Sequence, residues 1–338
     1  MRPVHASRKS LHEQVMVITG ASSGIGLATT QAAASHGAKV VLAARNAEAL
    51  AGIVEQIRRD GGEAIHVAAD VGTREAVQGI ADAAITRYGR IDTWVNDAGL
   101  SIFGRLEEVS DEDHARLFQT NFWGVVYGSL VAVPHLKQSG GVLINLGSVA
   151  SDIAFPLQGM YCASKHAIKG FTDALRIELE EAGADVAVTL IKPAAIDTPF
   201  PQHARNYTGR EPKLPPPVYD PREVALAILS AAERPQRDIY VGGAGRLMTA
   251  FQAVAPRTFD RIGRSMIAQQ MRDEPSRNPP GALHAAGEDG QVRGDHPGYV
   301  QRHSFYTRSA IHPAATGLLL TAGVAAAAAL MRGTGRRH

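Results

Sequence analysis

The chain has 338 residues, of which 45% are hydrophobic, and a formal net charge of +2. This composition allows a sizeable packed core, and so small a net charge gives no electrostatic reason to expect nucleic-acid binding. The single cysteine, Cys162, excludes an internal disulfide framework and is typical of a reducing compartment. Residues 1–13 are polar and basic and contain no apolar run of the kind found in secretory signals, so we expect a cytoplasmic protein.

Short apolar segments alternate with helical patterns along most of the chain. In the first hundred residues, strands are expected at 14–19, 39–44, 64–68 and 91–95, and helices at 27–36, 47–60 and 73–88. A long helix expected at 111–136 should kink or end near Pro134. Strands then follow at 141–146, 186–191 and 238–241, helices at 161–181 and 221–234, and a proline-rich loop at 199–220. This alternation predicts an α/β fold with a single Rossmann-like, doubly wound parallel sheet flanked by helices.

The composition divides the chain into four parts. These are an N-terminal arm at 1–13, the sheet domain at 14–245, a helical and flexible extension at 246–313, and an apolar segment at 314–331. Within the extension, residues 246–271 have an amphipathic pattern that predicts one helix, and the Gly- and Pro-rich residues 272–300 predict a mobile linker. The uncharged segment 314–331 is at the lower limit for a bilayer span, so membrane association and a helix packed on protein both stay open.

A glycine-rich turn follows the first expected strand and opens the first helix. Gly20, Gly24 and Gly26 would let the backbone approach a pyrophosphate, while the helix N-terminus presents N–H groups to the anion. This placement favours a dinucleotide site over an ordinary tight turn. The residues expected to contact the cofactor in this turn are Gly20, Ser22, Ser23, Gly24, Ile25 and Gly26.

The end of the second strand bears on the choice of cofactor. An NAD site usually has a carboxylate there for the ribose 2′-hydroxyl, whereas this chain has Ala43, Ala44 and Arg45. Arg45 could pair with a 2′-phosphate, so NADP(H) is favoured over NAD(H); the alternative is a solvated helix-start residue. Asp70 could accept a hydrogen bond from the adenine amino group. The further residues expected at the cofactor are Val71, Asn96, Ala98 and Gly99.

Tyr161 and Lys165 lie four residues apart, so a helix brings them to one face. The ammonium of Lys165 could lower the pKa of the phenol, which is about 10 when unperturbed. A phenol tuned in this way can pass a proton to or from an alcohol or carbonyl. With Ser148 upstream and a nucleotide site, the pair indicates redox chemistry between an alcohol and a carbonyl.

These motifs together resemble the short-chain dehydrogenase/reductase family over residues 14–243. The family pattern T-G-x-x-x-G-x-G matches residues 19–26, and its Y-x-x-x-K pattern matches Tyr161 and Lys165. Its N-N-A-G motif appears with Asp97 in place of the second asparagine, for which we expect a small consequence. Its P-G-x-x-x-T segment appears at 193–198 with Ala194 at the glycine.

The resemblance implies catalytic roles for Asn121, Ser148, Tyr161 and Lys165. Ser148 and Tyr161 would hold the substrate oxygen, with Tyr161 as acid or base, and Lys165 would also bind the nicotinamide ribose. Asn121 would hold a water that connects Lys165 to solvent. Ile196 and Thr198 would orient the carboxamide. No metal is expected. The runner-up is a non-catalytic nucleotide-binding sensor or scaffold on the same fold, against which the complete set of these residues argues.

The substrate and the assembly are less defined by the sequence. An apolar pocket for a small-molecule alcohol or carbonyl is expected from Leu100, Ile102, Phe103, Ile153, Phe155, Leu157 and Phe200, with the loop 199–220 as its lid. The resemblance implies a homodimer or homotetramer that pairs through the long helices at 111–136 and 161–181. Segment 314–331 would add membrane contact if it serves as an anchor.

Overall fold

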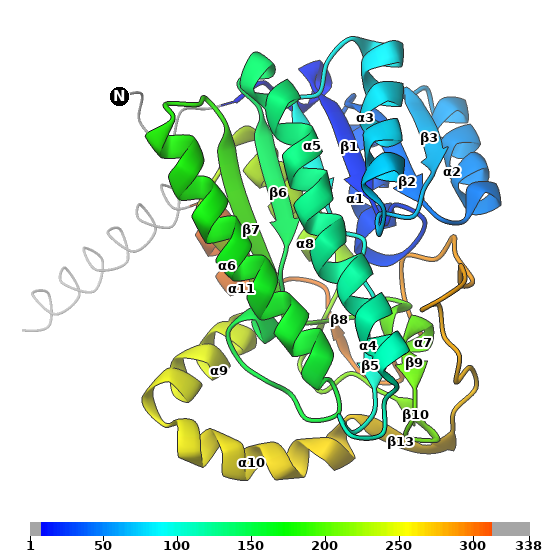
Figure 1. The fold of residues 1–338 in the computed structure, drawn as a ribbon, viewed down its shortest axis with the longest axis vertical. Helices are drawn as coiled ribbons and strands as arrows, with labels where there is room; N and C mark the ends of the chain where they lie inside the picture. The colour runs from blue at the N-terminus through cyan, green and yellow to red at the C-terminus, as the bar shows by residue number, and fades with distance from the viewer. Residues whose placement is uncertain (1–7, 313–338) are drawn as a thin grey trace, which may run out of the picture.

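The computed structural model describes residues 8–312, and a seven-stranded parallel sheet forms its centre (Figure 1). In spatial order the strands are β12 (Asp238–Val241), β7 (Ala187–Pro193), β6 (Val142–Leu146), β4 (Thr93–Asn96), β1 (Val15–Thr19), β2 (Lys39–Ala44) and β3 (Ala64–Ala68). The winding direction reverses between β1 and β4, and such a switch point is where open α/β sheets bind ligands. The predicted doubly wound sheet is therefore confirmed.

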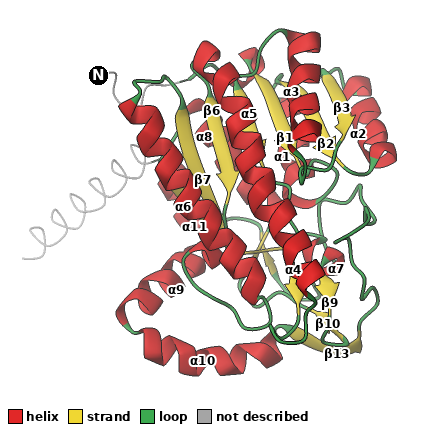
Figure 2. Cartoon of the chain, viewed as in Figure 1, coloured by secondary structure: helices red, strands yellow, loops and turns green. Residues whose placement is uncertain are grey.

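Helices cover both faces of this sheet, which gives three layers (Figure 2). One face carries α1 (Gly24–Ser35), α2 (Ala47–Arg59) and α8 (Pro221–Glu233), and the other carries α3 (Arg74–Tyr88), α5 (Gly124–Ser139) and α6 (Gly159–Glu181). Strand β2 shows why two cores form. Val40 and Leu42 join the α1 side, while Val41 and Ala43 join the α3 side, because successive side chains alternate.

The helix predicted at 111–136 is longer and less regular than expected. It comprises α4 (Asp111–Phe118), a π-helical turn (Gln119–Trp123) and α5, and Pro134 lies inside α5. Of the kink or end expected near Pro134, the end is contradicted, because the helix continues to Ser139 and Gly140 caps it with a φ of 63°. The irregularity instead falls at the π turn, which contains Asn121.

The single helix predicted at 246–271 is two helices in the structure. They are α9 (Gly243–Val254) and α10 (Pro256–Gln269), which meet at Ala255. Ala255 has φ −133° and ψ 58°, outside the helical region, because a residue that precedes proline is sterically excluded from it. The amphipathic pattern continues across the break, so it could not reveal the corner.

The structure also differs from the mobile linker predicted at 272–300. Strand β13 (Met271–Pro275) pairs with β10 (Arg210–Pro212), and β14 (Val300–Gln301) extends a small sheet with β11 (Val218–Tyr219) and β8 (Ala195–Ile196). The chain then forms α11 (Phe305–Ile311), which packs on β12 and α8. Composition alone missed these contacts, since every partner lies elsewhere in the sequence.

The loop predicted at 199–220 contains short elements that lie beyond the carboxyl ends of the sheet strands (Figure 1). They are α7 (Phe200–His203) and β9 (Arg205–Asn206), the latter paired with β5 (Ile102–Phe103), followed by β10 and β11. The predicted apolar segment 314–331 lies outside the described residues. Among the helices of residues 8–312, none is both long and apolar enough to cross a membrane.

Candidate active site

A cavity of about 440 Å³ opens at the carboxyl ends of the central strands, around the switch point between β1 and β4. It brings together most of the residues that the sequence singled out. Those that line it are Gly20, Ser22, Ser23, Gly24, Ile25, Arg45, Asp70, Val71, Ala98, Gly99, Ser148, Tyr161, Lys165, Ile196 and Thr198. The glycine-rich turn and the Tyr-Lys pair therefore face one space, although about 140 residues separate them in the chain.

The glycine-rich turn packs directly against the end of β4. Gly20 has a φ of 69°, and a Cβ there would lie 2.9 Å from the backbone of Ala98. A Cβ at Gly26 would clash with the carbonyl oxygen of Gly20. Thr19 fastens the same junction, because its hydroxyl accepts from the N–H groups of Asp97 and Ala98 at 3.1 and 3.2 Å. Only glycine permits this close approach of the turn to the segment that follows β4.

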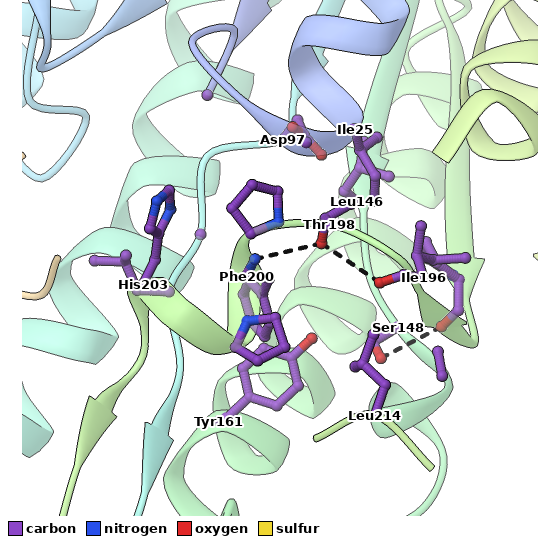
Figure 3. A pocket seen from close by; sticks show the side chains of 18 of the residues that line it. Ile25, Asp97, Leu146, Ser148, Tyr161, Ile196, Thr198, Phe200, His203 and Leu214 are labelled. Atoms are coloured by element: carbon purple, nitrogen blue, oxygen red, sulfur yellow. Dashed lines mark hydrogen bonds between the residues drawn. The ribbon is translucent and has the colours of Figure 1, made fainter. Parts of the chain in front are cut away.

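Tyr161 and Ser148 meet on the opposite wall of the cavity. Tyr161 stands in the first turn of α6, and its hydroxyl points toward that of Ser148, which follows β6 (Figure 3). The Ser148 hydroxyl accepts from the N–H of Ala150 at 3.1 Å and lies 3.5 Å from the carbonyl oxygen of Pro193. The short turn after β6 thus holds the serine in place beside the tyrosine.

Lys165 is one helical turn further along α6. Its ammonium donates to the carbonyl oxygen of Leu146 at 2.7 Å and lies 5.8 Å from the centroid of the Tyr161 ring. Burial lowers the pKa of Lys165 to about 8, and the carboxylate of Asp97 opposes that shift. For Tyr161, burial dominates and raises the pKa, while a hydrogen bond with Ser148 lowers it. Cys162 and Asp97 raise the pKa of Tyr161 further, and the lowering expected from Lys165 is not among the causes.

Asp97 has a larger place in the site than the sequence indicated. It lines the cavity, and burial raises its pKa to about 7, with Lys165 and the N–H of Gly26 acting in the opposite direction. The pKa values of Asp97 and Lys165, about 7 and about 8, lie close together, and the charge of each group affects the pKa of the other. The departure from the family's asparagine adds an ionisable group to the cavity.

Three predicted site residues do not line the cavity, namely Gly26, Asn96 and Asn121. Asn121 lies in the π-helical turn, and its side chain bonds both backbone groups of Leu100, accepting at 2.8 Å and donating at 2.9 Å. Asn96 is buried, where it accepts from the Trp94 indole and donates to Asn145, each at 2.8 Å. In this structure both asparagines brace the strand ends behind the site.

Arg45 and Asp70 also line the cavity, and both already have protein partners. Arg45 donates to the carbonyl oxygens of Ala282 and Leu283 at 2.5 and 3.3 Å. Asp70 forms a 2.5 Å ion pair with Arg116. Burial raises the pKa of Asp70, but hydrogen bonds from Gly72 and Arg116 more than offset this and hold the pKa below its usual value. Arg45 is thus anchored in the cavity wall and is not a solvated helix-start residue.

Part of the cavity wall comes from residues that the sequence did not associate with the site. The extension contributes Met248, Met266, Ala282, Ala286, Gly287 and Asp289. No local signal identified them, except that Ala282 and Leu283 form an apolar pair inside a polar stretch. Their position depends on where the extension folds back, which is decided by distant contacts.

Four of the seven residues expected to form an apolar pocket line the cavity. They are Leu100, Phe103, Phe155 and Phe200, and the Phe200 ring lies 5.5 Å from that of Tyr161. Ile102, Ile153 and Leu157 do not line it. The loop over the site adds Pro199, Pro201 and His203 and the segment 213–217. The space next to Tyr161 and Ser148 is therefore mainly apolar and partly covered.

A parallel sheet with a glycine-rich turn and a Ser-Tyr-Lys cluster at its switch point defines a nucleotide-binding oxidoreductase fold. The sequence profile of the short chain dehydrogenase family matches residues 14–208, and the chain belongs to this family. It is 44% identical over 326 residues to "Uncharacterized oxidoreductase YxnA" from Bacillus subtilis, covering 95% of this chain and 92% of that one. This match extends well beyond the family domain, so it includes most of the extension.

Two solved structures share the fold of the domain. A short chain dehydrogenase/reductase from Burkholderia phymatum in complex with NAD is 32% identical with a TM-score of 0.65, covering 72% of this chain and 94% of that one. An alcohol dehydrogenase from Thermococcus sibiricus complexed with 5-hydroxy-NADP is 28% identical with a TM-score of 0.60, covering 68% and 95%. The family and the fold are thus established, and the chain is an oxidoreductase of this family.

Proposed function

We propose that the protein is an NADP(H)-preferring oxidoreductase that interconverts a secondary alcohol and a carbonyl. The observation that carries this proposal is that Ser148, Tyr161 and Lys165 line the same cavity as the glycine-rich turn. Two walls of one space thus offer groups for proton transfer and for a dinucleotide. The glycine-rich turn suits such a cofactor, because Gly20 and Gly24 line the cavity without a side chain and Gly24 opens α1, whose N-terminal N–H groups favour an anion.

A bound nicotinamide dinucleotide supplies the hydride for this chemistry. Ser148 would hold the substrate oxygen, and Tyr161 would donate its proton to that oxygen as the carbonyl is reduced, or accept it in the reverse direction. Lys165 would bind the ribose and stabilise negative charge on the phenol. Asn121 would act indirectly, because its side chain bonds both backbone groups of Leu100 and so positions this residue at the cavity wall.

Tyr161→Phe tests this assignment directly. NADPH and NADH oxidation would be followed with aliphatic, aromatic and steroid-like carbonyls, and Tyr299→Phe, at an 82% exposed tyrosine, serves as the control. Loss of the proton donor should lower kcat by a factor of about 10²–10⁴ while dinucleotide binding persists. Unchanged turnover in Tyr161→Phe would refute the role of Tyr161. If the unmodified protein binds a dinucleotide tightly but turns over none of these carbonyls, the alternative of a non-catalytic nucleotide-binding sensor or scaffold would be favoured.

The preference for NADP(H) is proposed from Arg45 and from the missing carboxylate after β2. A charge-assisted contact with a 2′-phosphate contributes about 1.5–3 kcal/mol, so Arg45→Ala should weaken NADPH binding roughly tenfold to a hundredfold and NADH binding much less. The relatives bound to NAD and to 5-hydroxy-NADP allow either cofactor. Equal losses for the two dinucleotides would contradict the preference.

The pH dependence of carbonyl reduction gives a second test. Burial lowers the pKa of Lys165 to about 8, so the ammonium loses its charge as the pH rises through that value. If the ammonium supports proton transfer, kcat in the reductive direction should fall above about pH 8. Because Asp97 raises the pKa of Lys165, Asp97→Asn should move this limb to lower pH. If the fall in kcat occurs at the same pH in Asp97→Asn, then Asp97 does not influence the reaction through Lys165.

The substrate is proposed to be largely apolar near the reacting carbon. Phe155 and Phe200 line the cavity beside Tyr161, and Met248 and Met266 extend its apolar lining toward α9 and α10. Methionines adapt to ligands of irregular shape. Phe200→Ala should therefore raise KM for bulky aromatic or steroid-like carbonyls more than for short aliphatic ones.

Assembly and membrane contact remain proposals. Trp123 in the π-helical turn, Leu130 on α5 and Ile177 on α6 are exposed, which suits the expected homodimer or homotetramer, and light scattering would give its size. Removing residues 314–338 should abolish any membrane association while activity persists, if 314–331 is an anchor of an otherwise cytoplasmic protein. Sedimentation with anionic vesicles would measure the association.

A further inference from the structure

The segment 281–294 of the extension runs along the whole length of the proposed dinucleotide site. We call it the strap; in Figure 1 it lies in the orange part of the chain, beside the edge of the sheet that carries β2 and β3. At the adenosine end, Arg45 donates to the carbonyl oxygens of Ala282 and Leu283. Arg116 also donates to Leu283, at 3.1 Å. This end of the strap is therefore tied to the residues expected around the 2′-phosphate and adenine.

The middle of the strap bonds to the glycine-rich turn itself. The N–H of Gly290 donates to the carbonyl oxygen of Ser22 at 2.8 Å, and the N–H of Gly24 donates to that of Gln291 at 2.9 Å. Gly24 opens α1, whose N-terminal amides are the groups expected to face a pyrophosphate. The strap thus lies against the phosphate-binding backbone.

The far end of the strap reaches the nicotinamide side. Gly294 packs so closely on Thr198 that a Cβ would clash with the threonine carbonyl oxygen. Arg293 pairs with the buried carboxylate of Asp220 nearby. The contacts at Arg45, Gly24 and Thr198 therefore follow the order in which adenosine, pyrophosphate and nicotinamide would lie.

Little apolar burial holds the strap in place. Within 281–294 only Ala282 and Leu283 are buried, and the remaining contacts are mostly hydrogen bonds to backbone atoms. Arg293 also pairs with Asp220, and His284 with Asp113. A segment with so few buried apolar contacts opens locally at a free-energy cost below that of global unfolding. The cavity beneath the strap is lined from both sides, by the glycine-rich turn and by Ala282, Ala286, Gly287 and Asp289.

We propose that the strap is the outer wall of the dinucleotide site, that it opens to admit the cofactor and that it closes over the bound cofactor, so that strap opening limits cofactor exchange. This proposal rests on the proposed function, because it assumes that the cavity holds a nicotinamide dinucleotide. An opening step before entry and before release makes both rate constants depend on the strap.

Leu283→Ala in the full chain tests the gate. Leu283 is fully buried, so its truncation should raise the open population enough to increase kon and koff for NADPH each about tenfold or more. Leu247→Ala is the matched control, because Leu247 lies in the same extension but is 72% exposed. Stopped-flow fluorescence of the reduced nicotinamide gives both constants, and circular dichroism confirms that each variant is folded.

A second variant and a second readout guard against a merely local effect. Gly290→Pro removes the N–H that bonds Ser22, and its fixed φ of about −65° is incompatible with the φ of 91° at Gly290, so it should loosen the strap and also accelerate both steps. Trypsin can report strap opening, since Arg293 is the only Lys or Arg in residues 278–301. Saturating NADPH should slow cleavage after Arg293, and Leu283→Ala should speed it.

The outcomes separate this proposal from the proposed function. A rise in koff alone, with kon unchanged, would make the strap a passive wall and overturn the gate. Unchanged rate constants in both variants, or cleavage at Arg293 that NADPH does not slow, would also overturn it. If neither NADPH nor NADH binds the unmodified protein, the proposed function itself fails, independently of the strap.

Discussion

The sheet domain and the extension are stabilised by different forces. In the domain, side chains such as Val17, Leu143 and Ile144 are completely buried between two helical layers. Among the described residues from 243 to 312, the buried hydrophobic side chains are only Phe259, Met271, Ala282, Leu283 and Ile311. A continuous apolar core stabilises by area removed from water, whereas five buried hydrophobic side chains cannot stabilise the 70 residues from 243 to 312 alone.

The extension is attached instead through arginine and histidine side chains that pair with buried carboxylates of the domain. Three such pairs with arginine are Arg277 with Glu211, Arg293 with Asp220 and Arg308 with Glu223, and His284 hydrogen-bonds to Asp113 in a fourth. In each pair the carboxylate side chain is at most 7% exposed, while its partner is 43–55% exposed. The domain is therefore stabilised by its own apolar core, while the position of the extension depends on carboxylates that the domain supplies.

Truncation in the core should have the largest effect on stability. Ile144→Ala removes a fully buried side chain from β6 and should lower the free energy of unfolding by about 2–5 kcal/mol. Urea denaturation followed by circular dichroism measures it. Ile177→Ala, at a 67% exposed position on α6, is the control and should change stability far less unless subunits pair there. A small loss in Ile144→Ala would mean that the core repacks.

Breaking one charged attachment should have an intermediate effect. Arg308→Ala leaves Glu223, whose side chain is 3% exposed, with only its other contacts, such as the N–H of Ser304 at 2.8 Å. We expect a loss of about 1–2 kcal/mol, less than for a fully buried pair, because Arg308 is itself 46% exposed. Arg210→Ala, which breaks the exposed pair with Asp273, should cost at most about 0.5 kcal/mol. Equal losses would show that burial of the carboxylate does not matter.

The pH dependence of stability should reveal Asp97. Burial raises its pKa to about 7, so the folded state binds this proton more tightly than the unfolded chain, whose reference pKa is 3.8. The protonated form therefore favours the fold fully below about pH 4, and this contribution is lost as the pH rises to about 7 and beyond. Asp97→Asn should gain roughly 2–3 kcal/mol relative to the unmodified protein as the pH rises from 5 to 8.

Urea denaturation at both pH values measures this difference, with Asp260→Asn on the exposed face of α10 as the control. A stability difference between Asp97→Asn and the unmodified protein that does not vary with pH would show that the carboxyl titrates normally in the folded state.

The smallest effect on global stability is expected in the strap. Leu283→Ala should shift the urea midpoint little, because the strap opens before the domain unfolds. Native-state hydrogen exchange should nevertheless show faster exchange at Gly290, whose N–H bonds Ser22. A large shift in the urea midpoint would mean that the strap and the domain unfold together.

The sequence by itself determined the architecture and the local chemistry of the site. Strands β2, β3 and β12 have the predicted bounds, because apolar runs between turn residues need no distant information. The spacing of Tyr161 and Lys165 placed both on one face of α6, since helical geometry is local. The glycine-rich turn could be recognised from the sequence because its backbone packs so closely that only glycine fits at Gly20 and Gly26.

Only the tertiary structure decided what surrounds those motifs. The composition of residues 272–300 predicts a linker because it shows neither helical nor strand periodicity, while the partners of the strap at Ser22, Arg45 and Thr198 lie more than 90 residues away. The raised pKa of Asp97 likewise depends on burial beside Lys165. Local patterns specify the elements, but distances between remote segments, and the desolvation they cause, exist only after the chain has folded.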